Sequence, residues 1–145
     1  MESRISIGDL EPLAIEAMRG LGKYLGAAKL NVSLCGLIKI RASQINGCAY
    51  CIQLHSEEAR TQGETEQRIY ALSAWKESPL FTSEERAILA LTEEVTMISD
   101  HGLSKEVYDR SLQLFGDHGL AQYIVQIITV NAWNRIALST RMRHE

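Results

Sequence analysis

The sequence lacks both a long hydrophobic run and an excess of basic charge. Its 145 residues include 15 Lys and Arg against 18 Asp and Glu, so the net charge is −3. No segment supplies the roughly 18 consecutive apolar residues of a membrane span. The negative net charge does not indicate a nucleic-acid-binding protein, because such proteins are typically basic. Residues 1–6 also lack the apolar run of a signal peptide. We therefore expect a cytoplasmic protein with no membrane or nucleic-acid partner.

Cysteine is scarce as well, with three residues in the chain. Cytoplasmic thiols are kept reduced, which argues against a structural disulfide. Cys35 lies in the apolar stretch 32–38 and is expected to be a small buried hydrophobe. Cys48 and Cys51 remain as a pair three residues apart.

The chain contains two prolines, and its apolar residues recur with helical spacing. We predict an all-α fold of six or seven helices in a single domain, residues 1–145, with a core at about 30–140. The expected helices run from about Asp9 through Leu25, Ser33 to Ala42, Cys48 to Thr61, Thr65 to Trp75, Thr82 to about His101, Ser104 to Phe115 and Leu120 to Arg141. The last of these is apolar almost all round, which is typical of a central helix or of one at a subunit interface.

Cys48, Cys51 and His55 are separated by three and four residues, so a helix would place them on one face. Such a face can carry out thiol–disulfide chemistry, in which one thiol attacks, the second resolves the product and the histidine moves a proton. The preceding Asn46-Gly47 pair is a turn signal and places Cys48 at a helix N-terminus. There the helix dipole would lower the pKa of the thiol.

Other interpretations of the same residues remain open. Two cysteines and a histidine could bind zinc, but a closed structural site needs a fourth ligand, and the other histidines show no companion spacing. His55 could also be an ordinary structural residue. We expect no metal and no cofactor.

Glu93 stands out within an otherwise apolar predicted helix. Ile88, Leu91 and Val95 form one stripe, and Glu93 lies on the other side among further apolar residues. The residues alone favour an exposed position on a mixed face.

Four separated segments resemble the alkyl hydroperoxidase D-like branch of the carboxymuconolactone decarboxylase family. They are residues 37–51 with the following His55, 67–70, 91–96 and 131–135, and they occur in the family's order. The resemblance implies a helical fold that assembles as a homo-oligomer, either a dimer, a trimer or a hexamer. It also implies a peroxidase activity carried by the cysteine pair, with a hydroperoxide substrate and a dithiol or thioredoxin-like reductant.

The resemblance also assigns roles to individual residues. Cys51 matches the cysteine that attacks the hydroperoxide, Cys48 the more exposed partner that closes the disulfide, and His55 the proton-relay histidine. The family's best-known members carry a relay glutamate twelve residues before the first cysteine, where this chain has Gly36. Glu93 is the candidate replacement because apolar neighbours would raise its pKa, and Glu94 is the fallback.

Two further functions remain possible. A lactone-acid decarboxylase has no use for a CxxC pair, which argues against that activity. A non-enzymatic redox-responsive or scaffold protein would use the cysteines only to report oxidation, and Gly36 keeps this alternative open. In the segment 131–135, Asn131, Asn134 and Arg135 are expected to satisfy buried polar groups, and Trp133 to lie in the core or at a subunit interface. No catalytic role is assigned to Tyr50.

Overall fold

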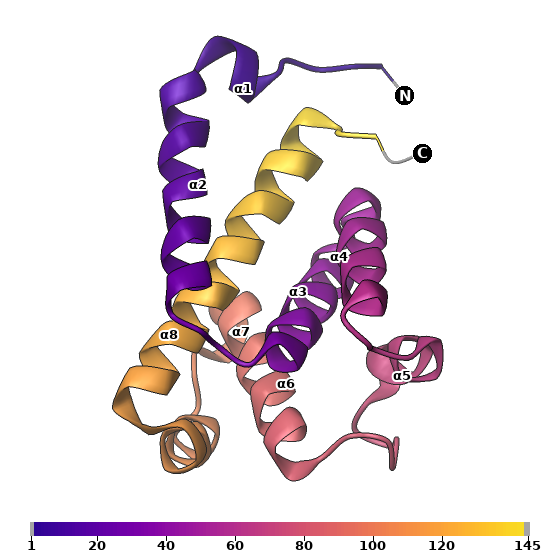
Figure 1. Cartoon of the computed structure of the whole chain (residues 1–145), viewed down its shortest axis with the longest axis vertical. Helices are drawn as coiled ribbons and strands as arrows, with labels where there is room; N and C mark the ends of the chain where they lie inside the picture. The colour runs from indigo at the N-terminus through magenta and orange to yellow at the C-terminus, as the bar shows by residue number, and fades with distance from the viewer. Residues whose placement is uncertain (1, 144–145) are drawn as a thin grey trace.

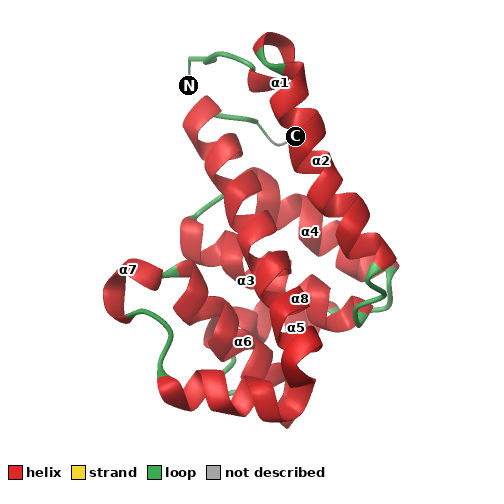
Figure 2. Cartoon of the chain, turned by 90° about the vertical axis from the view of Figure 1, so that its left-hand side faces the viewer, coloured by secondary structure: helices red, strands yellow, loops and turns green. Residues whose placement is uncertain are grey.

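Helices make up almost all of the computed structural model, which describes residues 2–143 (Figures 1 and 2). Within these residues there is no strand, which confirms the predicted all-α fold. Met1, His144 and Glu145 belong to the expected domain but lie outside the described residues. No helix in the described part is long and apolar enough to cross a membrane.

The observed helices differ from the expected ones mainly at their ends. They are α1 (Ile7–Leu10), α2 (Pro12–Ala27), α3 (Val32–Asn46), α4 (Ala49–Thr61), α5 (Glu66–Ala71), the 3-10 helix η1 (Leu72–Ala74), α6 (Ser83–Thr96), α7 (Ile98–His101) and α8 (Lys105–Thr140). Two of the eight α-helices, α1 and α7, are single turns of four residues. Helix α1 starts before the helix start that was expected near Asp9, and α7 forms the last turn of the helix that was expected to end near His101.

The expected helices 104–115 and 120–141 are the two arms of α8, which meet at a kink. Gly116 lies inside it with φ 71° and ψ 177°, a conformation that is open essentially only to glycine. The helical backbone is therefore interrupted at Gly116, and the chain changes direction there, between the two predicted helices (Figure 1). The following apolar residues, including the β-branched run that begins at Ile124, are helical as predicted.

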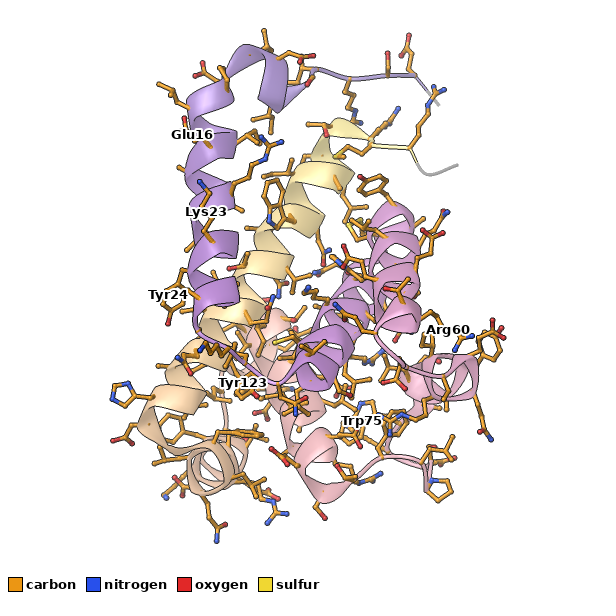
Figure 3. All side chains as sticks on the ribbon, in the orientation of Figure 1. Glu16, Lys23, Tyr24, Arg60, Trp75 and Tyr123 are labelled. Atoms are coloured by element: carbon orange, nitrogen blue, oxygen red, sulfur yellow. A yellow bond between two sulfur atoms is a disulfide. The ribbon has the colours of Figure 1, made fainter. Side chains whose placement is uncertain are left out.

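Helix α3 forms the centre of the fold and contacts α4, α6 and α8. Leu37, Ile38 and Ile40 of α3 are fully buried in this core. Helix α2 lies outside it, along the C-terminal half of α8, and contains no buried residue (Figure 1). Glu16, Lys23 and Tyr24 point away from the bundle on the outer side of α2 (Figure 3).

A cluster of amide side chains, Asn46, Asn131 and Asn134, fastens the end of α3 to α8. The Nδ2 group of Asn46 donates to Oδ1 of both Asn131 and Asn134, each at 2.9 Å. Asn134 is fully buried and donates from Nδ2 to Ser43 Oγ at 3.1 Å. Asn131 donates to Thr96 Oγ1 of α6 at 3.0 Å. Because each buried group has a partner, the amide cluster fixes three helices at the point where α3 ends.

Replacement of Asn134 by Ala tests this cluster. The change removes the hydrogen bonds to Asn46 and Ser43 and leaves a small buried void. We expect the free energy of unfolding to fall by about 2–4 kcal/mol, measured by urea denaturation of the oxidised protein. Ser139→Ala, at an exposed position on the same helix, should change it by less than about 0.5 kcal/mol. Equal effects of the two substitutions would contradict a stabilising role for the amide cluster.

Candidate redox site

The turn between α3 and α4 places the two cysteines. Gly47 ends α3 in the left-handed conformation, with φ 69°, which glycine adopts without steric cost. The N–H of Cys48 then donates to the carbonyl of Ser43 at 3.0 Å. Cys48 is the N-cap of α4, and its Sγ accepts from the N–H of Cys51 at 3.3 Å. The predicted position of Cys48 at a helix N-terminus is confirmed.

Cys48 and Cys51 are joined by a disulfide, with their Cα atoms 5.2 Å apart. Both residues are buried, at 1% and 3% exposure, and they pack against Ala137 of α8 and Tyr50. The expectation that Cys48 is the more exposed partner is therefore wrong for the single chain. Ala137 of α8 packs against both cysteines at the N-terminus of α4.

His55 lies one turn beyond Cys51 on α4. Its Nδ1 lies 3.2 Å from Oε2 of Glu58, so Nδ1–H donates to the carboxylate and Nε2 of the neutral ring is left as the acceptor. The same carboxylate lies 3.9 Å from Nζ of Lys39. Burial lowers the pKa of His55 below its ordinary 6.5, and Glu58 raises it in part. The ring is therefore neutral at pH 7 and can accept a proton.

Glu93 contacts a different set of residues. Its Oε1 accepts from Trp75 Nε1 at 2.7 Å and from the guanidinium of Arg41 at 3.1 Å, and Lys76 lies 3.6 Å from Oε2. The side chain is 12% exposed, so the expected exposed position is wrong. Cations and an indole surround the carboxylate in place of the expected apolar groups. Among the described residues, Glu58 and not Glu93 is the carboxylate that hydrogen-bonds His55.

Other residues singled out in the sequence have structural partners. Glu94, the fallback relay residue, accepts from the backbone N–H and the hydroxyl of Ser104, next to the start of α8. Asn131 and Asn134 satisfy buried polar groups, in agreement with expectation, and Arg135 donates to Oδ1 of Asn131. Among the described residues, no group of His, Cys, Asp and Glu is arranged to hold a metal ion.

A cavity of about 430 Å³ lies beside His55, between α2, α3, α4 and α8. His55 and Glu58 of α4, Cys35 and Lys39 of α3, and Trp133 of α8 contribute to its wall. Cys35 is a free thiol and is partly exposed, not fully buried as expected. Its pKa is raised by burial, which Lys39 partly offsets.

The sequence alone did not identify Glu58 or Lys39, and it did not predict that Trp133 lines a cavity. The spacing of Glu58, three residues after His55 on a predicted helix, was the signal that could have identified it. Lys39 and Trp133 come close to His55 only through the packing of separate helices, which no local pattern shows.

Comparison with known proteins identifies the family of the chain. A model of the carboxymuconolactone decarboxylase family matches residues 12–94. The uncharacterized protein YdfG of Bacillus subtilis is 38% identical over 139 residues, which are 96% of this chain and 95% of YdfG. A crystal structure of a protein of unknown function from Agrobacterium tumefaciens, proposed to be the antioxidant defence protein AhpD, superposes with a TM-score of 0.95. It is 37% identical over 99% of both chains.

More distant structures share the fold alone. The debrominase Bmp8 in complex with 2,3,4-tribromopyrrole has a TM-score of 0.84 at 22% identity, over 94% of this chain and 73% of Bmp8. An uncharacterized peroxidase-related protein from Silicibacter has a TM-score of 0.78 at 21% identity, over 88% of this chain and 68% of that protein. The family model covers more than half of the chain, and the relative in Bacillus subtilis spans almost all of it. The chain therefore belongs to the carboxymuconolactone decarboxylase family.

Proposed function

We propose that the protein is a thiol-dependent peroxidase that reduces alkyl or hydrogen peroxide through the Cys48–Cys51 pair. The observation that supports this proposal most directly is the disulfide at the start of α4, one turn from a histidine that is hydrogen-bonded to a carboxylate. A pair of cysteines that can exist as a dithiol or a disulfide stores the two electrons needed to reduce one peroxide. The similarity to the Agrobacterium protein supports the same activity.

Glu58, His55 and Cys51 form the proposed proton relay. The carboxylate of Glu58 holds Nδ1–H of His55, which fixes the tautomer whose Nε2 can take the proton of the Cys51 thiol. All three residues lie on α4, so the helix sets their spacing.

Glu58 can take the role of the relay glutamate that the family's best-known members carry where this chain has Gly36. Gly36 of α3 faces α4, where a Cβ on Gly36 would lie 3.6 Å from the Cβ of Ala59. Ala59 follows Glu58 directly in the sequence. Glu58 is the carboxylate of α4 that hydrogen-bonds His55, so it can supply the relay group that Gly36 lacks. We propose Glu58 for this role in place of Glu93.

The reaction balances with a peroxide and an external dithiol. The Cys51 thiolate attacks the terminal oxygen of the hydroperoxide, the O–O bond breaks, and the alkoxide leaves as an alcohol after taking a proton from His55. Cys51 is now a sulfenic acid. The Cys48 thiol displaces its hydroxyl as water, and the disulfide forms. A dithiol or thioredoxin-like partner reduces the disulfide and becomes oxidised itself.

Assembly belongs to the proposal as well. Helix α2 exposes Leu13, and α8 exposes Ile128 and Leu138. Apolar residues of this kind on two neighbouring helices support a homo-oligomer, either a dimer, a trimer or a hexamer.

Serine substitutions of the two cysteines separate their roles. Cys51→Ser should abolish peroxide turnover, because the attacking thiolate is lost. Cys48→Ser should still consume one equivalent of peroxide and should accumulate a sulfenic acid on Cys51, detected by mass spectrometry after trapping with dimedone. If the sulfenic acid forms on Cys48 in the Cys51→Ser protein and turnover persists, the assigned order of the cysteines is wrong. Disulfide formation without turnover with any dithiol would indicate a redox-responsive protein instead.

The pH dependence of kcat/KM tests the relay. His55 acts in its neutral form, so activity should fall as the pH falls through the pKa of His55, which lies below 6.5. Glu58 raises this pKa, and Glu58→Gln should therefore move the acid limb to lower pH. An acid limb above pH 6.5, or one that moves upwards in Glu58→Gln, would refute the relay.

Parallel substitution of the two glutamates decides between them. Glu58→Gln should reduce kcat/KM for peroxide by about tenfold or more at pH 7, since general acid–base groups contribute roughly 10²–10⁴-fold. Glu93→Gln should act mainly on stability, because it weakens contacts with Arg41 and Trp75. Both proteins are assayed per folded molecule, with folding followed by circular dichroism. A larger loss of kcat/KM in Glu93→Gln would restore Glu93 as the relay residue.

A further inference from the structure

The cavity beside His55 lies one helical turn from the disulfide along each of three helices. On α4 the cavity wall contains His55, and Cys51 precedes it by four residues. On α8 the wall contains Trp133, and Ala137, which packs on the disulfide, follows it by four residues. A four-residue step is about one turn, or roughly 6 Å along the axis. The cavity therefore ends close to the buried sulfur atoms.

The third helix gives the same position. Lys39 of α3 is in the cavity wall, and Ser43, one turn later, accepts the hydrogen bond from the N–H of Cys48. Of the α4 residues in the cavity wall, His55 lies nearest to Cys51 along the helix. A molecule in the cavity therefore meets His55 at its inner end.

The cavity wall combines apolar residues with two lysines, Lys29 and Lys39. Leu25, Leu30 and Val32 provide apolar surface near α2, and Val130 and Trp133 provide it on α8. A volume of about 430 Å³ lies within the usual range for organic ligands, roughly 300–1,000 Å³. The cavity is thus larger than hydrogen peroxide needs and can take an amphiphilic organic molecule.

The charged groups of the wall favour an anion. Two lysines, Lys29 and Lys39, face one carboxylate, Glu58. Glu58 is already hydrogen-bonded to His55, and its distance of 3.9 Å from Lys39 Nζ is long for an ion pair. The side chain of Lys39 is 32% exposed, so its ammonium is screened less than one on the open surface. Lys39 can therefore pair with an anionic group of a ligand.

We propose that this cavity binds an organic hydroperoxide that carries a carboxylate and an apolar chain, with Lys39 as the residue that selects the carboxylate. The hydroperoxide group lies towards His55 and Cys51 and the chain against Trp133 and its apolar neighbours. The carboxylate lies on Lys39, at the same end of the cavity as His55, because both side chains contact Glu58. This inference rests on the proposed peroxidase function for the reaction, but the binding itself can be measured without turnover.

Protection of Cys35 from alkylation provides that measurement. In the oxidised protein the other two cysteines form the disulfide, so Cys35 is the free thiol, and it lines the cavity. Modification by N-ethylmaleimide is followed by mass spectrometry with decanoate or with decan-1-ol, an uncharged probe of the same chain length. Decanoate should slow the reaction, and decan-1-ol should need a higher concentration for half-protection.

Substitution of the lysine identifies the source of the preference. Lys39→Gln should raise the decanoate concentration for half-protection by roughly fivefold and should leave that for decan-1-ol nearly unchanged. Each variant is compared with its own rate without ligand, because Lys39 also influences the thiol of Cys35. Lys29→Gln is a second variant with a smaller expected effect, since Lys29 is exposed. Lys105→Gln, at an exposed lysine of α8 that pairs with Asp109, is the control and should match the native protein.

The outcomes separate this inference from the proposed function. Failure of decanoate to protect Cys35, or equal protection by both probes in the native protein and in Lys39→Gln, would overturn the inference even if tert-butyl hydroperoxide is reduced. Stronger protection of Cys35 by decanoate than by decan-1-ol, with no turnover of any peroxide, would support a carboxylate-binding cavity and contradict the proposed peroxidase function. If the cavity binds carboxylates and the protein reduces peroxides, Lys39→Gln should lower kcat/KM for a carboxylate-bearing hydroperoxide relative to that for tert-butyl hydroperoxide.

Discussion

The hydrogen bonds of Asn46 to Asn131 and Asn134 are the interaction on which the site depends. They hold the last turn of α3 against α8 directly before Gly47, where the chain reverses into α4. The position of Cys48, and with it the start of α4, follows from this attachment. Because α8 also covers the disulfide through Ala137, one pair of helix contacts both places the sulfur atoms and shields them from water.

The site combines a covered disulfide with an accessible proton acceptor. The Glu58 side chain is 45% exposed, whereas both cysteines are buried. His55 connects these two environments, and its burial keeps the ring neutral at pH 7. This arrangement suits a reaction in which the thiol loses a proton to His55 and the leaving alkoxide gains one, without water reaching the sulfenic acid freely.

The sequence was sufficient for the features that depend on short spacing. Helical periodicity gave the all-α fold, the Asn46-Gly47 pair gave the turn, and Cys48, Cys51 and His55 gave the face of α4. It was not sufficient for features that depend on packing between distant segments. Glu93 appeared to be an isolated carboxylate because Arg41 and Trp75 are 52 and 18 residues away.

The central claim is that Cys48 and Cys51 are a peroxide-reactive dithiol that turns over. The direct measurement is an anaerobic titration of the fully reduced protein with tert-butyl hydroperoxide, with free thiols counted and peroxide consumption then followed in the presence of dithiothreitol. The account predicts that one equivalent of peroxide removes two of the three thiols, that Cys35 stays reduced, and that dithiothreitol sustains repeated consumption of peroxide. If all three thiols survive excess peroxide, the pair is not redox-active toward peroxides and the account is wrong.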